Sequence, residues 1–379
     1  MKQPQADDTP QLSGEKAKRY NRIKIRVTIT DMAAGIIFIA FLAFSGISQW
    51  LVIRITDAGV SGDYYIFLLF LAVLGTANGI IGLPLDFYSS YIIEHRYGLS
   101  NQTIPAWTAE RLKSLGVGLA IGVPVSLLFF FLIRTAGHYW WVIFSGAVFL
   151  FAVIMARVAP VLIFPLFYTF KPLEESELRE KINTLMRRYS IPIQGIFSFN
   201  LSKDTKKANA GFTGIGKSKR VILSDTLMEQ FTTSEIMVIF AHELGHYLKR
   251  HIVKNVIMSG VIIFLSFYVC SGLYDWTRGI YGFQKPDDIA ALPILLFYLT
   301  VTGLIIMPLT NALSRKYERE ADRFAVTLTD DPDSFISGME KLADRNLSDK
   351  NPHPLVEFLL YSHPSIGKRI QFAERLKEQ

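Results

Sequence analysis

Two histidines four residues apart, with a glutamate directly after the first, are the residues of this chain whose spacing best suits chemistry. They form the sequence His242-Glu243-Leu244-Gly245-His246. On an α-helix, residues four apart lie one turn above each other, so both imidazoles can bind one zinc ion while the glutamate reaches a zinc-bound water. Zinc lowers the pKa of that water to about 7 and polarises a peptide carbonyl, and the glutamate carries the proton to the leaving amine. The pattern therefore predicts a zinc peptidase with one Zn²⁺ per chain, ligands His242 and His246, and general base Glu243.

A catalytic zinc needs a third protein ligand and an open fourth position. Glu318 is the best candidate, because it directly follows the last apolar run on what should be a helix. The same spacing describes a charged, solvated helix face equally well, so Glu318 stays open on these grounds. Asp322, one turn later on the same face, could accept a hydrogen bond from the second ring nitrogen of a ligand histidine. Glu320 is predicted to point elsewhere.

The remaining histidines show no such spacing. His251 lies five residues after His246, off the face of the predicted helix, and beside Lys249 and Arg250 it is expected at the lipid headgroups. His363 stays undecided. Three others are expected at the surface or the membrane interface: His95, His138 and His353.

The elements that must position these residues are mostly apolar. Half of the 379 residues are hydrophobic and 19% are charged, which is more apolar than a soluble domain usually is. Apolar runs of about 18 residues predict spanning helices, because hydrocarbon leaves backbone groups no partner outside the helix. One such run could be a buried helix of a soluble core, but six together favour an all-α multi-spanning membrane protein. The runs are Met32–Ile53, Tyr64–Leu85, Leu115–Ile133, Tyr139–Ala156, Asn255–Leu273 and Ile289–Leu309. The fourth is expected to continue, kinked at two prolines, to Phe170.

The basic residues predict the orientation. Many lie in the first thirty residues, whereas the short connections after the first and third spans hold Arg54 and Arg134 alone, which predicts a cytoplasmic N-terminus. With six spans, both termini and the active site fall on the cytoplasmic side. The predicted segments are a basic N-terminus at 1–30, four spans at 31–170 with a cytoplasmic loop near 86–114, a peptidase segment at 171–254, two spans at 255–310, and a helical segment at 311–379 that completes the zinc site.

The two polar segments should hold gluzincin-like helices and a small β-hairpin or sheet. Thr233 or Ser234 is the expected N-cap of the helix that carries the histidine pair. The expected helices are Glu174–Arg188, Ile236–Lys249, Ser314–Leu328, Pro332–Arg345 and Pro364–Lys377, and the β-like runs are Gly195–Asn200 and Lys219–Ser224.

A second motif suggests a different chemistry. Gly211 to Ser218 satisfies the phosphate-loop pattern G-x-x-x-x-G-K-S, which needs a strand before it and a helix after it. A β-like run follows instead, and about twenty residues before the zinc helix leave no room for a nucleotide-hydrolysing domain. We interpret the segment as a glycine-rich hairpin or edge strand, to which a peptide could add by main-chain hydrogen bonds, and expect no nucleotide.

Charge and cysteine content limit the remaining options. The net charge of +7 is largely juxtamembrane, where anionic headgroups of the bilayer are the ordinary partner, so no nucleic acid is expected. Cys270 is the single cysteine of the sequence, which excludes a disulfide framework or a cysteine metal site within one chain.

These motifs together resemble the integral-membrane CaaX prenyl proteases of type I, a family of zinc metallopeptidases. The resemblance covers most of the chain. It rests on Glu94 to Thr103, on Asn209-Ala210 and the stretch leading to Val221–Leu227, on the histidine motif, on Asn311 to Ala325, and on His363 to Arg369.

The resemblance implies roles for individual residues. Glu318 falls on the family's third zinc ligand, and Asp322 on the carboxylate that orients a ligand. Asn209 and the strand after it, Ala210, Gly211 and Phe212, would hold substrate. His363 and Arg369 would approach the zinc and stabilise the tetrahedral intermediate.

Two departures leave the substrate open. The eukaryotic members have seven spans around a water-filled chamber, whereas six are counted here, and the short chain suggests a bacterial protein of the inner membrane. The expected activity is removal of C-terminal residues from prenylated CaaX peptides. The alternatives are quality-control cleavage of misfolded membrane proteins, whose substrates carry no prenyl group, and a non-catalytic membrane scaffold or transporter with a structural zinc site.

Overall fold

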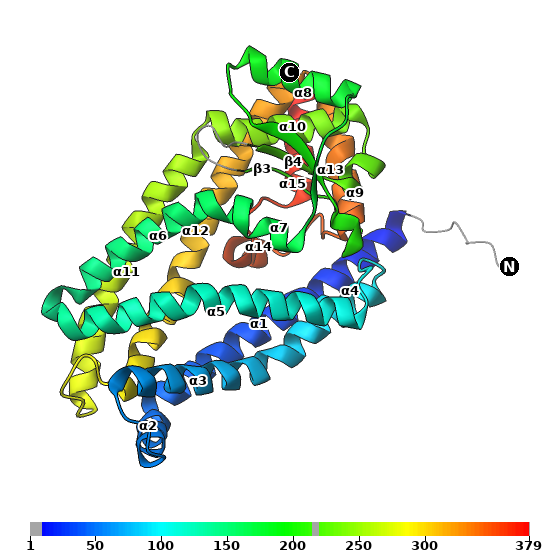
Figure 1. Cartoon of the computed structure of the whole chain (residues 1–379). Helices are drawn as coiled ribbons and strands as arrows, with labels where there is room; N and C mark the ends of the chain where they lie inside the picture. Colours follow the sequence, from blue (N-terminus) through cyan, green and yellow to red (C-terminus); the bar gives the residue numbers. More distant parts are fainter. Residues whose placement is uncertain (1–9, 214–219, 379) are drawn as a thin grey trace.

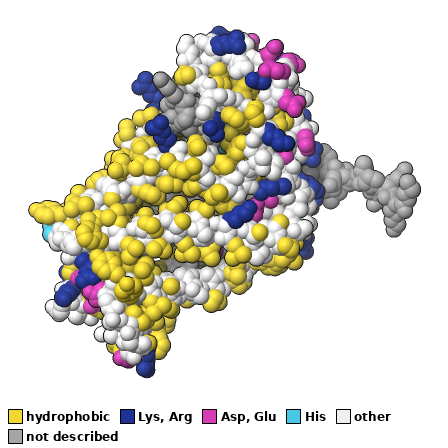
Figure 2. Space-filling view, in the orientation of Figure 1, with side chains coloured by type: hydrophobic (Ala, Val, Ile, Leu, Met, Phe, Trp, Pro, Cys, Tyr) yellow, Lys and Arg dark blue, Asp and Glu magenta, His cyan; other side chains and the backbone are white. Residues whose placement is uncertain are grey.

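Six long apolar helices dominate the computed structural model, which describes residues 10–213 and 220–378. Each is long and apolar enough to cross a membrane, so the prediction of an all-α protein with six spans is confirmed. Figure 2 shows hydrophobic side chains over these helices and charged side chains gathered near their ends. The segments are Gly14–Phe44, Asp63–Arg96, Ile104–Thr135, Gly137–Phe167, His251–Ile280 and Ile289–Thr329.

The spanning region is built from helices of very different length (Figure 1). Two spans contain more than one element: α3 continues through the short π-helix Phe87–Ile92 into α4, and α6 is followed by α7. The bounds are α1 Pro10–Phe44, α2 Ile47–Asp57, α3 Asp63–Asp86, α4 Ile93–Arg96, α5 Ile104–Thr135, α6 Trp140–Leu162, α7 Phe164–Phe167, α11 His251–Ile280 and α12 Leu292–Thr329.

The first apolar run is not one helix, so the expected span Met32–Ile53 is wrong at its end. α1 stops at Phe44 and α2 begins at Ile47. Gly46 between them has φ 81°, a left-handed conformation that glycine adopts without a Cβ clash. At its other end α1 extends back to Pro10, so much of the basic N-terminus is helical.

α12 is a single helix of 38 residues that leaves the spanning region and enters the peptidase region. The predicted boundary at 310/311 therefore lies inside one continuous helix. Its apolar first half packs with α1 and α11, and its polar second half packs with α10 (Figure 1).

The peptidase region contains a small mixed sheet. Its strands are β1 Phe170–Pro172, β2 Gly195–Phe199, β3 Ala210–Thr213 and β4 Arg220–Ser224, in the order β1-β2-β4-β3. β2 and β4 run parallel, and the other two pairs are antiparallel. β3 therefore lies at one edge of the sheet.

The glycine-rich motif falls partly on this edge. β3 ends at Thr213 and the chain re-enters the described part at β4, its antiparallel neighbour. The predicted hairpin or edge strand thus fits the described residues, while Gly214 to Lys219 lie outside them. A strand follows, not the helix that a phosphate-binding loop requires.

Helices cover the sheet and enclose the α10 helix from both sides. Amphipathic α8 buries Leu178, Ile182 and Met186 in a cluster with the sheet and one face of α10. The opposite face of α10 packs on α12, α13 and α15. The bounds are α8 Glu177–Arg188, α9 Asp225–Gln230, α10 Thr233–Leu248, α13 Pro332–Asn346, α14 Pro354–Leu360 and α15 Ile366–Lys377.

Candidate metal and active site

α10 carries the histidine pair, and its first turn is fixed by a capping box. The Thr232 hydroxyl accepts a hydrogen bond from the Glu235 amide at 3.3 Å, and the Glu235 carboxylate accepts one from the Thr232 amide at 2.8 Å. The N-cap is therefore Thr232, not the expected Thr233 or Ser234. Lys341 of α13 also pairs with Glu235, at 2.7 Å, which ties α10 to the helix beside it.

His242, His246 and Glu318 meet where α10 crosses α12. The two Nε2 atoms are 3.0 Å apart, and they lie 3.3 Å and 3.2 Å from the two oxygens of Glu318. Spacing alone leaves the role of Glu318 open, and the structure brings this side chain to the histidine pair. One nitrogen from each ring and one carboxylate oxygen thus converge within 4.8 Å of one another.

Asp322 lies behind His242, as the spacing of Glu318 and Asp322 on one helix face suggested. Its Oδ1 accepts a hydrogen bond from His242 Nδ1 at 2.8 Å, and its side chain is 1% exposed. Arg369 of α15 donates to both oxygens of this carboxylate, at 2.9 Å and 2.6 Å. The bidentate pair fixes the carboxylate, which in turn fixes the orientation of the His242 ring.

His251 is where the sequence interpretation was wrong. It does not lie at the headgroups: it is 2% exposed, and its Nδ1 is 3.0 Å from Nδ1 of His246. α10 ends at Leu248, and Arg250, at φ 56°, turns the chain so that His251 begins α11. The prediction extended the helical periodicity of α10 through this turn and so placed the ring on the wrong side. No residue type in this stretch indicates a left-handed turn.

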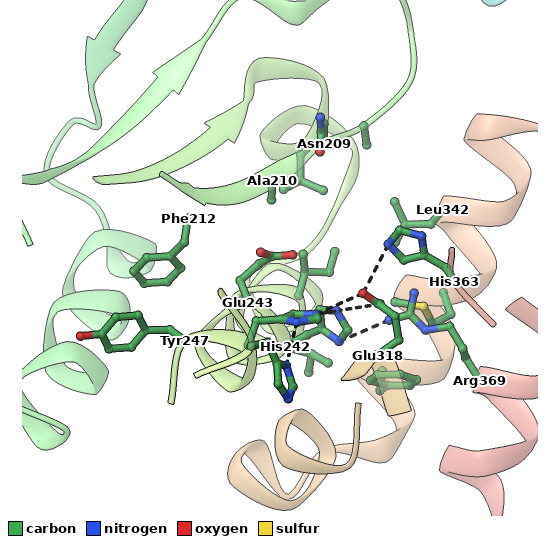
Figure 3. A pocket seen from close by; sticks show the side chains of 18 of the residues that line it. Asn209, Ala210, Phe212, His242, Glu243, Tyr247, Glu318, Leu342, His363 and Arg369 are labelled. Atoms are coloured by element: carbon green, nitrogen blue, oxygen red, sulfur yellow. Dashed lines mark hydrogen bonds and ion pairs between the residues drawn. The ribbon is translucent and has the colours of Figure 1, made fainter. Parts of the chain in front are cut away.

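A pocket of about 470 Å³ opens over the three converging side chains. In Figure 3, Glu243 stands beside His242, with Phe212 and Tyr247 on one side and His363 and Arg369 on the other. Among the described residues Glu243 makes no hydrogen bond, so its carboxylate can take a proton from a ligand in the pocket. The spanning helix α11 contributes three lining residues that the sequence did not place in the site: His251, Ile252 and Asn255.

His363 lies in the loop between α14 and α15, at the rim of this pocket. Its side chain is 62% exposed, and its Nε2 is 3.4 Å from Oε1 of Glu318. Ser362 contacts the other ring nitrogen at 2.9 Å. The structure thus brings His363, which the spacing argument left undecided, to the converging carboxylate.

The loop that carries His363 is anchored by a buried arginine. Arg315 of α12, 8% exposed, donates to backbone carbonyls of Glu357 and Tyr361 at the end of α14. α14 itself was not expected. Pro354 occupies its first turn and His353 accepts the amide of Leu355 at 3.2 Å, so a short capped helix lies between the two expected helices Pro332–Arg345 and Pro364–Lys377.

The edge strand β3 lies along the same pocket. Ala210 and Phe212 of β3 line it and Gly211 between them does not, as alternation along a strand gives; Asn209, directly before the strand, lines it as well. Asn209 is fixed by its backbone, which exchanges hydrogen bonds with Ser224 at 3.0 Å and 2.9 Å.

The donor set fits a zinc ion. Two imidazole nitrogens and one carboxylate form the usual ligand set of catalytic zinc, with a fourth position left for water or substrate. Glu318 supports the fit, because its Oε2 is buried and has no hydrogen-bond partner among the described residues. A buried carboxylate oxygen without a partner is costly unless a cation binds it.

Comparisons with known proteins agree with this geometry. A family model described as "Peptidase family M48" matches residues 172–377, and one described as "CAAX prenyl protease N-terminal, five membrane helices" matches residues 4–169. The uncharacterized metalloprotease YhfN of Bacillus subtilis is 31% identical, over 95% of this chain and 85% of its own. CAAX prenyl protease 1 of Saccharomyces cerevisiae is 30% identical, over 96% and 86%. The crystal structure of S. mikatae Ste24p aligns with a TM-score of 0.85 at 29% identity, covering 99% of this chain and 92% of that one.

Proposed function

This chain belongs to peptidase family M48 and is an integral membrane metallopeptidase, and we propose that it hydrolyses peptide bonds at a zinc ion held by His242, His246 and Glu318. The observation that carries the proposal is the convergence of these three side chains under a pocket that also contains Glu243 and borders an edge strand. Zinc, when bound, supplies a Lewis acid that acidifies water and polarises a peptide carbonyl.

The protein's own groups divide the remaining work. The Glu243 carboxylate takes a proton from the attacking water and delivers it to the nitrogen of the breaking C–N bond. His363 donates a hydrogen bond to the carbonyl oxygen as negative charge develops there. Arg369 contributes positive charge at the same place and holds Asp322, which keeps His242 in one orientation.

The edge strand supplies a means of holding the substrate. A peptide that pairs with the backbone of β3 would pass over the converging ligands, with Asn209 at the start of the strand and Phe212 beside the Tyr247 ring. The Phe212 and Tyr247 rings are 6.2 Å apart and stacked, and together with Ile252 they give this end of the pocket an apolar wall.

For the substrate we favour a prenylated CaaX peptide, because relatives that this chain matches over most of its length are named for that activity. An apolar wall continuous with the spanning helix α11 suits a lipidated substrate. The basic residues of α1 favour an orientation with both termini and the active site in the cytoplasm, and relatedness to a Bacillus protein favours a bacterial inner membrane.

The deciding experiment uses purified, zinc-loaded protein in detergent with two peptides of one CaaX sequence, one farnesylated and one not. Each is also tested with Glu243→Ala. Glu243-dependent cleavage of the farnesylated peptide alone supports the CaaX proposal, and cleavage of both favours broader quality control. If neither peptide is cleaved although zinc is bound, this substrate assignment is wrong and the scaffold alternative gains support.

A further inference from the structure

The two ligand histidines are supported in different ways. Both rings direct Nε2 toward Glu318, so each has Nδ1 as its outer nitrogen. Nδ1 of His242 reaches a carboxylate directly, that of Asp322. Nδ1 of His246 instead contacts another imidazole, that of His251, at 3.0 Å.

Behind His251 stands a second carboxylate. The Nε2 atom of His251 is 3.1 Å from Oε2 of Glu320, which lies on α12 between Glu318 and Asp322. Each ligand histidine is thus connected to an acidic residue of α12. His242 contacts Asp322 directly, and His246 is connected to Glu320 through the His251 ring.

Metal coordination selects one proton arrangement along this chain of contacts. A histidine that binds zinc through Nε2 is neutral and carries its proton on Nδ1, so His246 donates to His251. Nδ1 of His251 must then accept, which places the proton of a neutral His251 ring on Nε2. That atom faces Glu320 and donates to it, so both contacts are satisfied at once.

The surrounding structure holds the intervening ring still. His251 stacks on Tyr317, with centroids 4.4 Å apart and planes at 13°, and both side chains are buried. The left-handed Arg250 is what brings the ring back toward α10, and an arginine seldom adopts φ near 56°. Such backbone outliers are found where a site needs them.

We propose that His251, supported by Glu320, is a positioning residue that orients the zinc ligand His246 and fixes its tautomer. Its effect is exerted through His246, whose Nδ1 it contacts. The inference rests on the proposed zinc site, and it adds two residues to the groups on which metal affinity depends. Removing a hydrogen-bond partner of a ligand histidine typically weakens metal binding by about 10- to 100-fold.

The test separates hydrogen bonding from packing by replacing one ring in three ways. His251→Phe can keep the stack on Tyr317 but offers no acceptor, and His251→Asn places an oxygen near the position of Nδ1. His251→Ala removes both features. His138→Phe is the matched control, because that exposed histidine lies in the connection between α5 and α6. The readouts are zinc affinity by competition with a chromophoric chelator and the visible absorption spectrum after Co²⁺ substitution.

We expect His251→Phe and His251→Ala to weaken zinc binding by about 10- to 100-fold and to change the Co²⁺ spectrum, while His251→Asn restores much of the loss. With zinc saturating, kcat should fall and KM should stay near the parent value. Parent-like affinity and spectrum in His251→Phe would overturn the proposal.

A second variant and the zinc content of the parent protein complete the test. If the His251 variants do not fold, Glu320→Ala takes their place, because Glu320 is one-third exposed. This variant should weaken zinc binding. An unchanged zinc affinity and Co²⁺ spectrum in it would overturn the proposal. If the parent protein itself binds no zinc, it is the proposed metal site that fails, and this is distinguishable from a parent that binds zinc with no contribution from His251.

Discussion

Gly245 lies so close to α12 that a Cβ atom on it would be 3.2 Å from the Cα atom of Ala321 and 3.1 Å from the Phe324 ring. This glycine stands directly before the ligand His246, and Ala321 follows Glu318 by three residues on α12. The contact therefore sets the distance between the two helices at the level of the converging ligands. A side chain here would need both the Phe324 ring and the α12 backbone to move.

Gly245→Ala should weaken zinc binding and destabilise the protein, because the added methyl group separates α10 from α12. Overpacking of this kind costs about 1–3 kcal/mol. Zinc affinity and thermal unfolding in detergent measure the two effects. Gly303→Ala on α12 is the matched control, since its Cβ would meet nothing within 4 Å. Equal zinc affinity in the two variants would contradict this account.

Glu243→Gln should bind one zinc per chain and unfold at the parent temperature, yet lose peptide hydrolysis by at least about 10²- to 10⁴-fold. The amide keeps the size of the side chain but cannot accept the proton of the attacking water. Metal analysis and a peptide assay on one preparation give both numbers. Near-parent turnover by the zinc-loaded variant would exclude Glu243 as the general base.

Asp322→Asn should lower zinc affinity by about 10- to 100-fold, because the neutral amide orients the His242 ring less strongly. The same change removes the charge that Arg369 pairs with in a buried site, so thermal stability should fall as well. Competition with a chelator and a melting curve are the measurements. Asp333→Asn, at an exposed ion pair with Lys377, serves for comparison and should alter neither.

In the metal-free protein, both the stability of the fold and the affinity for zinc should depend on pH through His242. Burial lowers the pKa of this imidazole, but the hydrogen bond to Asp322 and the nearby Glu318 carboxylate outweigh burial and raise the pKa to about 9 in the metal-free protein. Protonated His242 then stabilises the metal-free fold fully below the unfolded-state pKa of about 6.5, and this contribution is lost as the pH rises through 9.

Zinc must displace that proton, so zinc affinity should rise by about tenfold per pH unit between about pH 7 and pH 9 and level off above. Melting curves of chelator-treated protein and zinc titrations across this range test both statements. His242→Gln should bind zinc weakly at every pH and show no such slope from this residue. A flat affinity profile for the parent protein would contradict the prediction.

The sequence predicted the parts of the site that depend on one helix. Residues four apart share a helix face whatever surrounds them, so His242, Glu243 and His246 followed from spacing. Glu318 belongs to another helix, and local spacing does not predict which helices distant in the sequence pack together. It came from the resemblance to a family, as did the positions of His363 and Arg369.

The errors lie where the chain changes direction. Arg250, Gly46 and Pro354 each begin or end an element, and periodic patterns cannot show whether a helix stops there. The change from apolar to polar residues near Asn311 predicted a boundary that the structure does not have, because α12 continues through it without a break. Patterns of polarity follow the environment of a helix, and α12 passes from one environment to another.

Because α12 is one continuous helix, its length gives the distance from the spanning region to the metal site. Its apolar run ends at Leu309, nine residues before Glu318, which is a rise of about 14 Å along the helix axis. An extended peptide covers that height with about four residues. With the hydrocarbon edge at Leu309, a lipid attached next to the bond would have to be lifted out of the bilayer and sheltered by the protein during cleavage, whereas a protein anchored further away could be cut where it stands.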